Sequence, residues 1–356
     1  MKIFKTTVLT LAILAGSLTY AQDEVAEESA VEATEEKPSF SVSGSIDTYY
    51  RSNDYAPNTS FANLPGYALG MANIVLSYEG EKSGFVADLV YGPRGADAVF
   101  GSNLSIGGED YLAGSSNIVN QLYAYYNVND KLTLTLGNFN TFLGYEVISP
   151  VANFNYSTSY MFSYGPFSHT GIKADYAVSD NVSIMVAVMN ATDETEADYS
   201  DASTFGAQLG LYGQYINFLS GDDYTQFDFT GGFNISEKLF LGINATTTEL
   251  AADASFSGVA LYPQYTLSDS FSLGIRGEIF SETNGGAGAL YSGALSGSSE
   301  DADNTSFTIT GSYTKGNFIL KPEFRIDTAS ANIYSKNTTD FSDNLASFVV
   351  AAIYAF

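Results

Sequence analysis

The sequence predicts an all-β protein, a transmembrane antiparallel up-and-down β-barrel of about sixteen strands with short periplasmic turns and long extracellular loops. Three observations predict this fold. Tyr (26), Phe (25) and Gly (33) are abundant and Pro (8) is sparse, which favours strands and turns. Short segments with apolar residues at alternate positions recur, separated by polar turns. Beyond the N-terminus, no stretch reaches the roughly 18 consecutive apolar residues of a membrane helix.

The N-terminus has the layout of a secretory signal peptide. Lys2 and Lys5 form its positive region, VLTLAILAGSL is the apolar core, and Thr19 and Ala21 occupy the cleavage positions. The stretch that follows is rich in Glu and Ala, lacks aromatic residues and predicts a disordered acidic segment. The expected divisions are a signal peptide (1–21), an acidic segment (22–38) and a single β-barrel domain (39–356).

Four stretches repeat one hairpin pattern, in which apolar residues at alternate positions flank a polar turn triplet. They begin at Tyr126, Tyr176, Phe233 and Tyr265. Their apolar residues share one face of an antiparallel pair, and the Asn, Asp, Ser and Glu between them suit a tight turn. Three looser examples begin at Tyr78, Leu211 and Tyr313. Seven hairpins give fourteen strands, and an opening strand (40–50) and a closing strand (345–356) complete sixteen.

The connections between successive hairpins are mostly longer and polar. They are 51–68, 93–117, 144–168, 193–203, 284–304 and 329–344. Short turns at one end and long loops at the other are typical of an outer-membrane barrel. The large apolar faces, with aromatic residues recurring at the turn ends, favour such a barrel over a secreted sandwich or solenoid.

The closing strand alternates up to a terminal aromatic residue, and Tyr354 and Phe356 form the expected assembly signal for the barrel assembly machinery. Several segments resemble one family, the OmpL-like putative β-barrel porins of Gram-negative outer membranes. The similar pieces are SGSIDTYY, GNFNTFLGYEVISPVANFNYSTSYMFSYGPFSHTGIKADY, LGIRGEIF, EFRID and the terminal strand, spread over most of residues 40–356. The resemblance implies a general porin fold and a channel function, but it supplies no site residues.

Charge and composition exclude several functions. The net charge of −26 leaves no basic surface for nucleic acid. Cysteine is absent, and the acidic loops lack the ordered spacing of a calcium loop; we expect neither metal nor cofactor. The single histidine, His169, adjoins Ser168, but adjacent strand residues point to opposite faces. We therefore expect no catalytic residues and no enzyme.

The alternation assigns seven acidic and four basic side chains to polar strand faces. As pore-lining candidates these are Asp47, Asp88, Lys173, Asp175, Asp228, Arg276, Glu278, Lys321, Glu323, Arg325 and Asp327. Their acidic excess predicts a mild cation bias, although lateral pairing that supports the wall is an alternative. In the stretch FILKPEFRID (318–327), we expect the four charges to face water. Pro322 predicts a bulge or a missing bond, because proline cannot donate to a β-ladder.

The connection 144–168 is rich in Tyr and Phe and carries one charge, Glu146. We expect so apolar a loop to fold into the barrel and narrow the pore; packing on the rim or against a neighbouring subunit is the alternative. The expected constriction residues are Tyr145, Glu146, Phe154, Tyr156, Tyr160, Phe162 and Tyr164.

The sequence therefore predicts an integral protein of the cell outer membrane, exported through a cleaved signal peptide. We expect a porin that allows passive diffusion of small hydrophilic solutes and ions. Outer-membrane lipids and the assembly machinery are its expected partners, and homo-oligomerisation is left open. The alternatives are a substrate-selective porin, for example for sugars, and a non-conducting structural or adhesive barrel.

Overall fold

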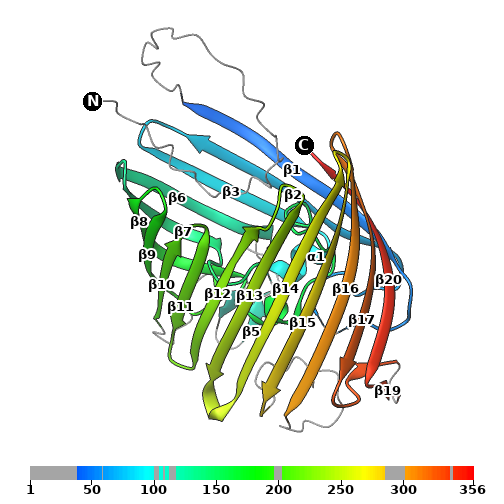
Figure 1. Cartoon of the computed structure of the whole chain (residues 1–356). Helices are drawn as coiled ribbons and strands as arrows, with labels where there is room; N and C mark the ends of the chain where they lie inside the picture. Colours follow the sequence, from blue (N-terminus) through cyan, green and yellow to red (C-terminus); the bar gives the residue numbers. More distant parts are fainter. Residues whose placement is uncertain are drawn as a thin grey trace.

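The computed structural model describes residues 38–57, 59–99, 104–106, 109–111, 118–195, 203–284, 301–336 and 340–356. Sixteen antiparallel strands form one closed barrel (Figure 1). The signal peptide and nearly all of the acidic segment lie outside the described residues. Within the described ranges, no helix is both long and apolar enough to cross a membrane.

The strands follow one another around the barrel in chain order. They are β1 (Ser39–Arg51), β2 (Gly66–Glu79), β3 (Ser83–Tyr91), β6 (Val119–Asn129), β7 (Leu132–Asn140), β8 (Ser168–Ser179), β9 (Val182–Met189), β10 (Thr204–Leu211), β11 (Gln214–Ser220), β12 (Tyr224–Asn234), β13 (Leu239–Leu250), β14 (Ser255–Ser268), β15 (Phe271–Thr283), β16 (Ala302–Lys315), β17 (Phe318–Ala329) and β20 (Asn344–Ala355). The connections also contain α1 (Pro93–Ala98), α2 (Tyr160–Tyr164), η3 (Ala251–Asp253) and two small hairpins, β4 (Leu104–Ile106) with β5 (Glu109–Tyr111) and β18 (Tyr334–Ser335) with β19 (Phe341–Ser342).

The predicted fold class is confirmed, including the strand number and all seven tight hairpins. The first and last strands close the barrel by pairing from Ser45–Ala355 to Arg51–Val349. The seven tight turns lie at one end of the barrel, and the longer connections lie at the other end. Two connections at that end are short, 221–223 between β11 and β12 and 251–254 between β13 and β14.

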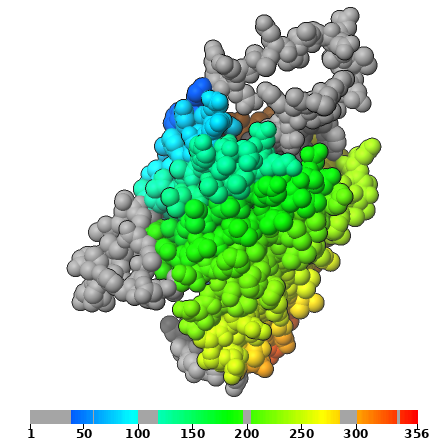
Figure 2. Space-filling view, turned by 90° about the vertical axis from the view of Figure 1, so that its left-hand side faces the viewer, coloured from blue at the N-terminus to red at the C-terminus, as the bar shows by residue number. Residues whose placement is uncertain are grey.

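The two faces of the wall are apolar outside and polar inside. On β17, Phe324 and Ile326 are each 40% exposed, whereas Arg325 and Asp327 are 1% and 0% exposed. A soluble protein buries its apolar side chains and exposes its charges, so this reversal suits a wall that faces lipid. Figure 2 shows the outer surface over the green strands as a continuous wall.

Pro322 interrupts the ladder between β16 and β17, as its missing N–H predicts. The pairing runs to Thr310–Glu323 and resumes at Tyr313–Leu320 in the same register. The missing-bond form of the prediction therefore applies, and no bulge forms. On its other side Pro322 pairs with Val350 of β20, so the barrel stays closed.

Connections from the loop end fold back and pack inside the barrel. Phe61, Val99, Tyr160 and Ile333 come from four different connections and are 2%, 6%, 0% and 0% exposed. The first two belong to one buried hydrophobic cluster, and the last two to another that includes Phe280 of the inner wall. The hydrophobic core of the protein thus lies within the barrel.

Candidate functional site: the interior segment and the charged wall

Residues 144–168, which we call the interior segment, comprise most of the connection between β7 and β8 together with the first residue of β8, and lie inside the barrel. The side chains of Tyr156 and Tyr160 are fully buried. Ser159 caps the short helix α2, since its hydroxyl accepts the Phe162 N–H at 3.1 Å. The tyrosine hydroxyls reach other parts of the protein: Tyr156 donates to Asp47 of β1 at 2.5 Å, and Tyr160 donates to the Pro57 carbonyl at 2.6 Å.

Two wall carboxylates each hold a pair of successive backbone N–H groups of the segment. Glu323 of β17 accepts the N–H groups of residues 156 and 157 at 2.7 and 3.1 Å. Glu278 of β15 accepts those of residues 160 and 161, both at 2.9 Å. Residues 160 and 161 begin α2, where backbone N–H groups have no partner within the helix. The carboxylates therefore satisfy donors that would otherwise be buried and unpaired.

Wall cations hold backbone carbonyls of the same segment. Lys321 of β17 donates to the Pro150 carbonyl at 2.8 Å. Arg325, four positions later on the same face, donates to the Thr158 carbonyl at 2.8 Å and forms an ion pair with Asp327 at 2.8 Å. Along β17, the basic side chains thus bind backbone carbonyls of the segment and the carboxylate of Glu323 binds its backbone N–H groups. Hydrogen bonds with a charged partner are stronger than neutral ones.

The single charge of the segment is paired with the wall. Glu146 and Arg276 of β15 form an ion pair at 2.7 Å, and their side chains are 3% and 0% exposed. The second carboxylate oxygen of Glu146 accepts the Ser159 N–H at 2.7 Å. Arg276 also donates to the Ser157 carbonyl at 2.6 Å. A buried pair of this kind needs such additional hydrogen bonds, because both ions are removed from water.

Glycines on the inner wall leave space for aromatic rings of the segment. A Cβ at Gly242 of β13 would lie 2.5 Å from the Tyr145 ring, and one at Gly274 of β15 would lie 2.3 Å from the Phe154 ring. The Tyr145 ring stacks on Tyr262 with centroids 4.3 Å apart. Glycine inside a strand commonly marks such a close approach.

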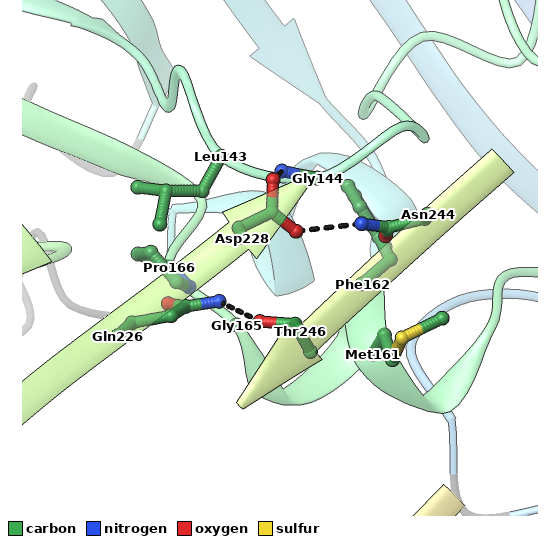
Figure 3. A pocket seen from close by; sticks show the side chains of 10 residues that line it. All are labelled: Leu143, Gly144, Met161, Phe162, Gly165, Pro166, Gln226, Asp228, Asn244 and Thr246. Atoms are coloured by element: carbon green, nitrogen blue, oxygen red, sulfur yellow. Dashed lines mark hydrogen bonds between the residues drawn. The ribbon is translucent and has the colours of Figure 1, made fainter. Parts of the chain in front are cut away.

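The segment also fits closely against β12 and β13, where a hollow of about 10 Å³ lies between them; Figure 3 shows the side chains that line it. Asp228 accepts the Gly144 N–H at 3.0 Å and the Asn244 side-chain amide at 2.6 Å. Beside them, Gln226 donates to Thr246 at 2.8 Å. The hollow has room for about one water molecule, so little space separates the segment from this part of the wall.

The comparisons with known proteins agree with this architecture. A family model described as "Putative beta-barrel porin-2, OmpL-like" matches residues 39–356. The chain belongs to this family of porins. No curated protein matches the chain significantly.

The porin fold is also that of several solved outer-membrane proteins. OmpT of Vibrio cholerae in its trimer form is 11% identical with a TM-score of 0.54, over 90% of this chain and 100% of OmpT. The channel DcaP of Acinetobacter baumannii is 12% identical with a TM-score of 0.55, over 90% of this chain and 98% of DcaP. The anion-selective porin from Comamonas acidovorans is 9% identical with a TM-score of 0.52, over 90% of this chain and 100% of that porin. At such identities the likeness concerns the fold.

The eleven charges proposed to line this porin's lumen fall into two groups. Nine are at most 3% exposed: Asp47, Asp88, Asp228, Arg276, Glu278, Lys321, Glu323, Arg325 and Asp327. The expectation that the four charges of FILKPEFRID face water is therefore wrong, because the interior segment covers them. The other two, Lys173 and Asp175 of β8, retain side-chain exposures of 25% and 41%. The alternative of lateral pairing across strands finds no support among the described residues: Arg276 pairs with Glu146 of the segment, and Asp327 pairs with Arg325 of its own strand.

The expected constriction residues all lie in or beside the packed interior. Glu146, Tyr156, Tyr160 and Phe162 are buried, and Tyr145, Phe154 and Tyr164 are partly buried. The residues expected to form the assembly signal lie elsewhere: Tyr354 and Phe356, at the end of the closing strand, are 51% and 53% exposed.

Arg94 is a functional candidate that the sequence reasoning missed. It lies on α1, is 2% exposed, and donates to the carbonyls of Ile148 and Tyr156 at 3.1 and 3.4 Å. Its guanidinium also lies 4.3 Å from the centre of the Phe61 ring. Pro93, which opens α1, is a helix-start signal, but nothing in the sequence connects Arg94 with residues some 50 positions later.

Proposed function

We propose that this porin allows passive diffusion of small hydrophilic solutes and ions, and that the interior segment narrows the path. The proposal rests on the uneven cover of the inner wall. The segment binds charged side chains of β15 and β17, whereas Lys173 and Asp175 of β8 keep side-chain exposures of 25% and 41%. The strand order places β8 across the barrel from β16. Water therefore reaches these two side chains of β8.

A mild preference for cations is part of the proposal. Seven of the eleven inner-wall charges are acidic. Asp47, Asp88 and Asp228 lie within 4.0 Å of no described basic side chain. A wall with uncompensated carboxylates attracts cations through its field, although burial weakens the effect of each group.

The test is to delete residues 150–164 and record single channels in a planar bilayer. The deletion removes the carbonyl and N–H groups held by Lys321, Glu323 and Arg325, so water can enter and conductance should rise. The control is a heat-modifiability gel, which reports whether the shortened chain still forms a barrel. A folded barrel with unchanged conductance would contradict a constricting role.

A second candidate, a barrel that does not conduct, is favoured by the packed interior. Buried hydrophobic clusters inside the barrel include Tyr156 with Val349, and Phe139 with Leu219. The same bilayer recording separates the candidates: the intact protein conducts if it is a porin, and carries no current if the packed connections seal it.

The route to the membrane is also proposed. We infer cleavage after Ala21 from the signal-peptide pattern, and recognition of the terminal strand by the assembly machinery. The apolar outer wall supports contact with outer-membrane lipids. Homo-oligomerisation is supported by the fold alone, which resembles OmpT in its trimer form. Mass spectrometry of the mature N-terminus and native mass spectrometry of the detergent-solubilised protein test these points.

A further inference from the structure

Two charged pairs in the barrel share one local geometry. Lys173–Asp175 on β8 and Arg325–Asp327 on β17 each join residues two positions apart on the inner face, with N–O distances of 2.8 Å. Their surroundings differ. The side chains of the second pair are 2% and 0% exposed, whereas those of the first are 25% and 41% exposed. The residue spacing, the signs of the charges and the N–O distance are thus matched, and exposure to water differs.

The neighbours of the exposed pair are uncharged. Across the ladder, Lys173 is opposite Thr135 and Ala187, and Asp175 is opposite Thr133 and Met185. The Lys173 ammonium lies 5.5 Å from the centre of the Phe139 ring. No described charge of an adjoining strand therefore compensates or competes with either member of the pair at this level of the lumen.

A permeating ion can approach these two groups much more closely than the nine covered charges. Ions in water are screened from a fixed charge beyond about 10 Å at 0.1 M salt. The covered charges act on the lumen only through the intervening segment, and several already bind its main chain. An ion in water beside Lys173 or Asp175 can approach within about 4 Å, where a unit charge changes its local concentration by about fivefold.

We propose that the ion selectivity of this pore is most sensitive to the charge balance of the Lys173–Asp175 pair. The inference rests on the proposed channel function. As a pair the two charges nearly cancel, so the intact protein keeps only the mild bias of the wall. Loss of one member leaves a single uncompensated charge in water on the conduction path.

The experiment is a reversal-potential measurement on the full-length mature protein in a planar bilayer, under a tenfold KCl gradient. Asp175→Asn should shift the chloride-to-potassium permeability ratio towards chloride by about fivefold. Lys173→Gln should shift it towards potassium by a similar factor. The double variant should return it close to the wild-type value. Unchanged ratios, or shifts of the same sign in both single variants, would overturn the inference.

Asp327→Asn is the matched comparison, because it removes the same group from the covered pair. It should lower thermal stability, since Arg325 loses a buried partner, and leave the ratio near the wild-type value. If this variant does not fold, Asp180→Asn, in the exposed turn of the same β8–β9 hairpin, supplies the control. If either control shifts the permeability ratio as much as Asp175→Asn does, selectivity depends on the electric field of the whole protein, and the inference is wrong. Absence of current in the wild type would instead refute the channel function itself.

Discussion

Replacing Glu146 by Gln removes the only charge of the interior segment and leaves Arg276 without its ion-pair partner. Arg276 is fully buried, and its ion pair with Glu146 measures 2.7 Å. Removing one partner of a buried pair costs about 3–5 kcal/mol. A glutamine oxygen can still accept from Arg276 or from the Ser159 N–H, but its NH₂ group would then face the other donor. We therefore expect Glu146→Gln to destabilise the packed position of the segment by about 3–5 kcal/mol.

Such a loss should change the opening equilibrium of the segment by about two to four powers of ten. Hydrogen exchange measured by mass spectrometry in detergent micelles tests this. In Glu146→Gln, peptides covering 146–161 should exchange at least a hundredfold faster, while peptides from the barrel strands stay protected. Glu81→Gln, in the exposed turn between β2 and β3, is the control. Unchanged exchange across 146–161 in a folded variant would refute the view that this pair holds the segment in place.

Two further predictions probe the packing and the C-terminal end of the segment. Gly274→Ala places a Cβ 2.3 Å from the Phe154 ring, whereas Gly277→Ala on the same strand meets no atom within 4 Å. Thermal unfolding should show that only Gly274→Ala lowers the free energy of unfolding, by about 1–3 kcal/mol. Equal losses in both variants would contradict close packing of the Phe154 ring against Gly274. Asp193 accepts the N–H groups of residues 167 and 168 at 2.6 and 2.8 Å, and burial raises its carboxyl pKa from 3.8 to about 6. Because this pKa is higher in the folded protein, the carboxyl favours folding below pH 4, and that contribution is lost as pH rises through 6. Asp193→Asn keeps an acceptor without the charge, so it should raise the melting temperature at pH 7.5 and have little effect at pH 4. An equal change at both pH values would contradict the assignment.

The wall was largely predictable because it depends on local signals. The signals for a hairpin turn and for the two-residue alternation of its strands lie within about ten consecutive residues. The stretch that begins at Tyr176, with its turn at 180–181, is an example. The parity of the pattern also placed Arg325 and Asp327 on the inner face. The gap in the ladder at Pro322 was also predictable, because proline lacks a backbone N–H in any surroundings.

What the inner charges contact could not be predicted in the same way. Glu323 binds main-chain N–H groups some 167 positions earlier in the chain. Because every residue except proline has a backbone N–H, the sequence does not indicate which one Glu323 binds. A lumen filled with water and one filled by a folded connection therefore predict the same alternation on β17. Gly242 and Gly274 did carry a signal. Both share the inner-face parity of their strands, and strand glycines indicate close approach of another group.

The wall charges bind the main chain of the segment, whereas the segment's side chains fill the space around it, so substitutions in the two should have different effects on the pore. The carboxylate of Glu278 and the guanidinium of Arg325 bind main-chain atoms, which every residue but proline supplies in full. These contacts fix the path of the segment without specifying most of its side chains. The side chains, such as Phe154 against Gly274, fill the remaining space and set its shape. We therefore expect substitutions in segment side chains to alter the width of the path, and substitutions in the wall charges to alter whether the segment stays inside.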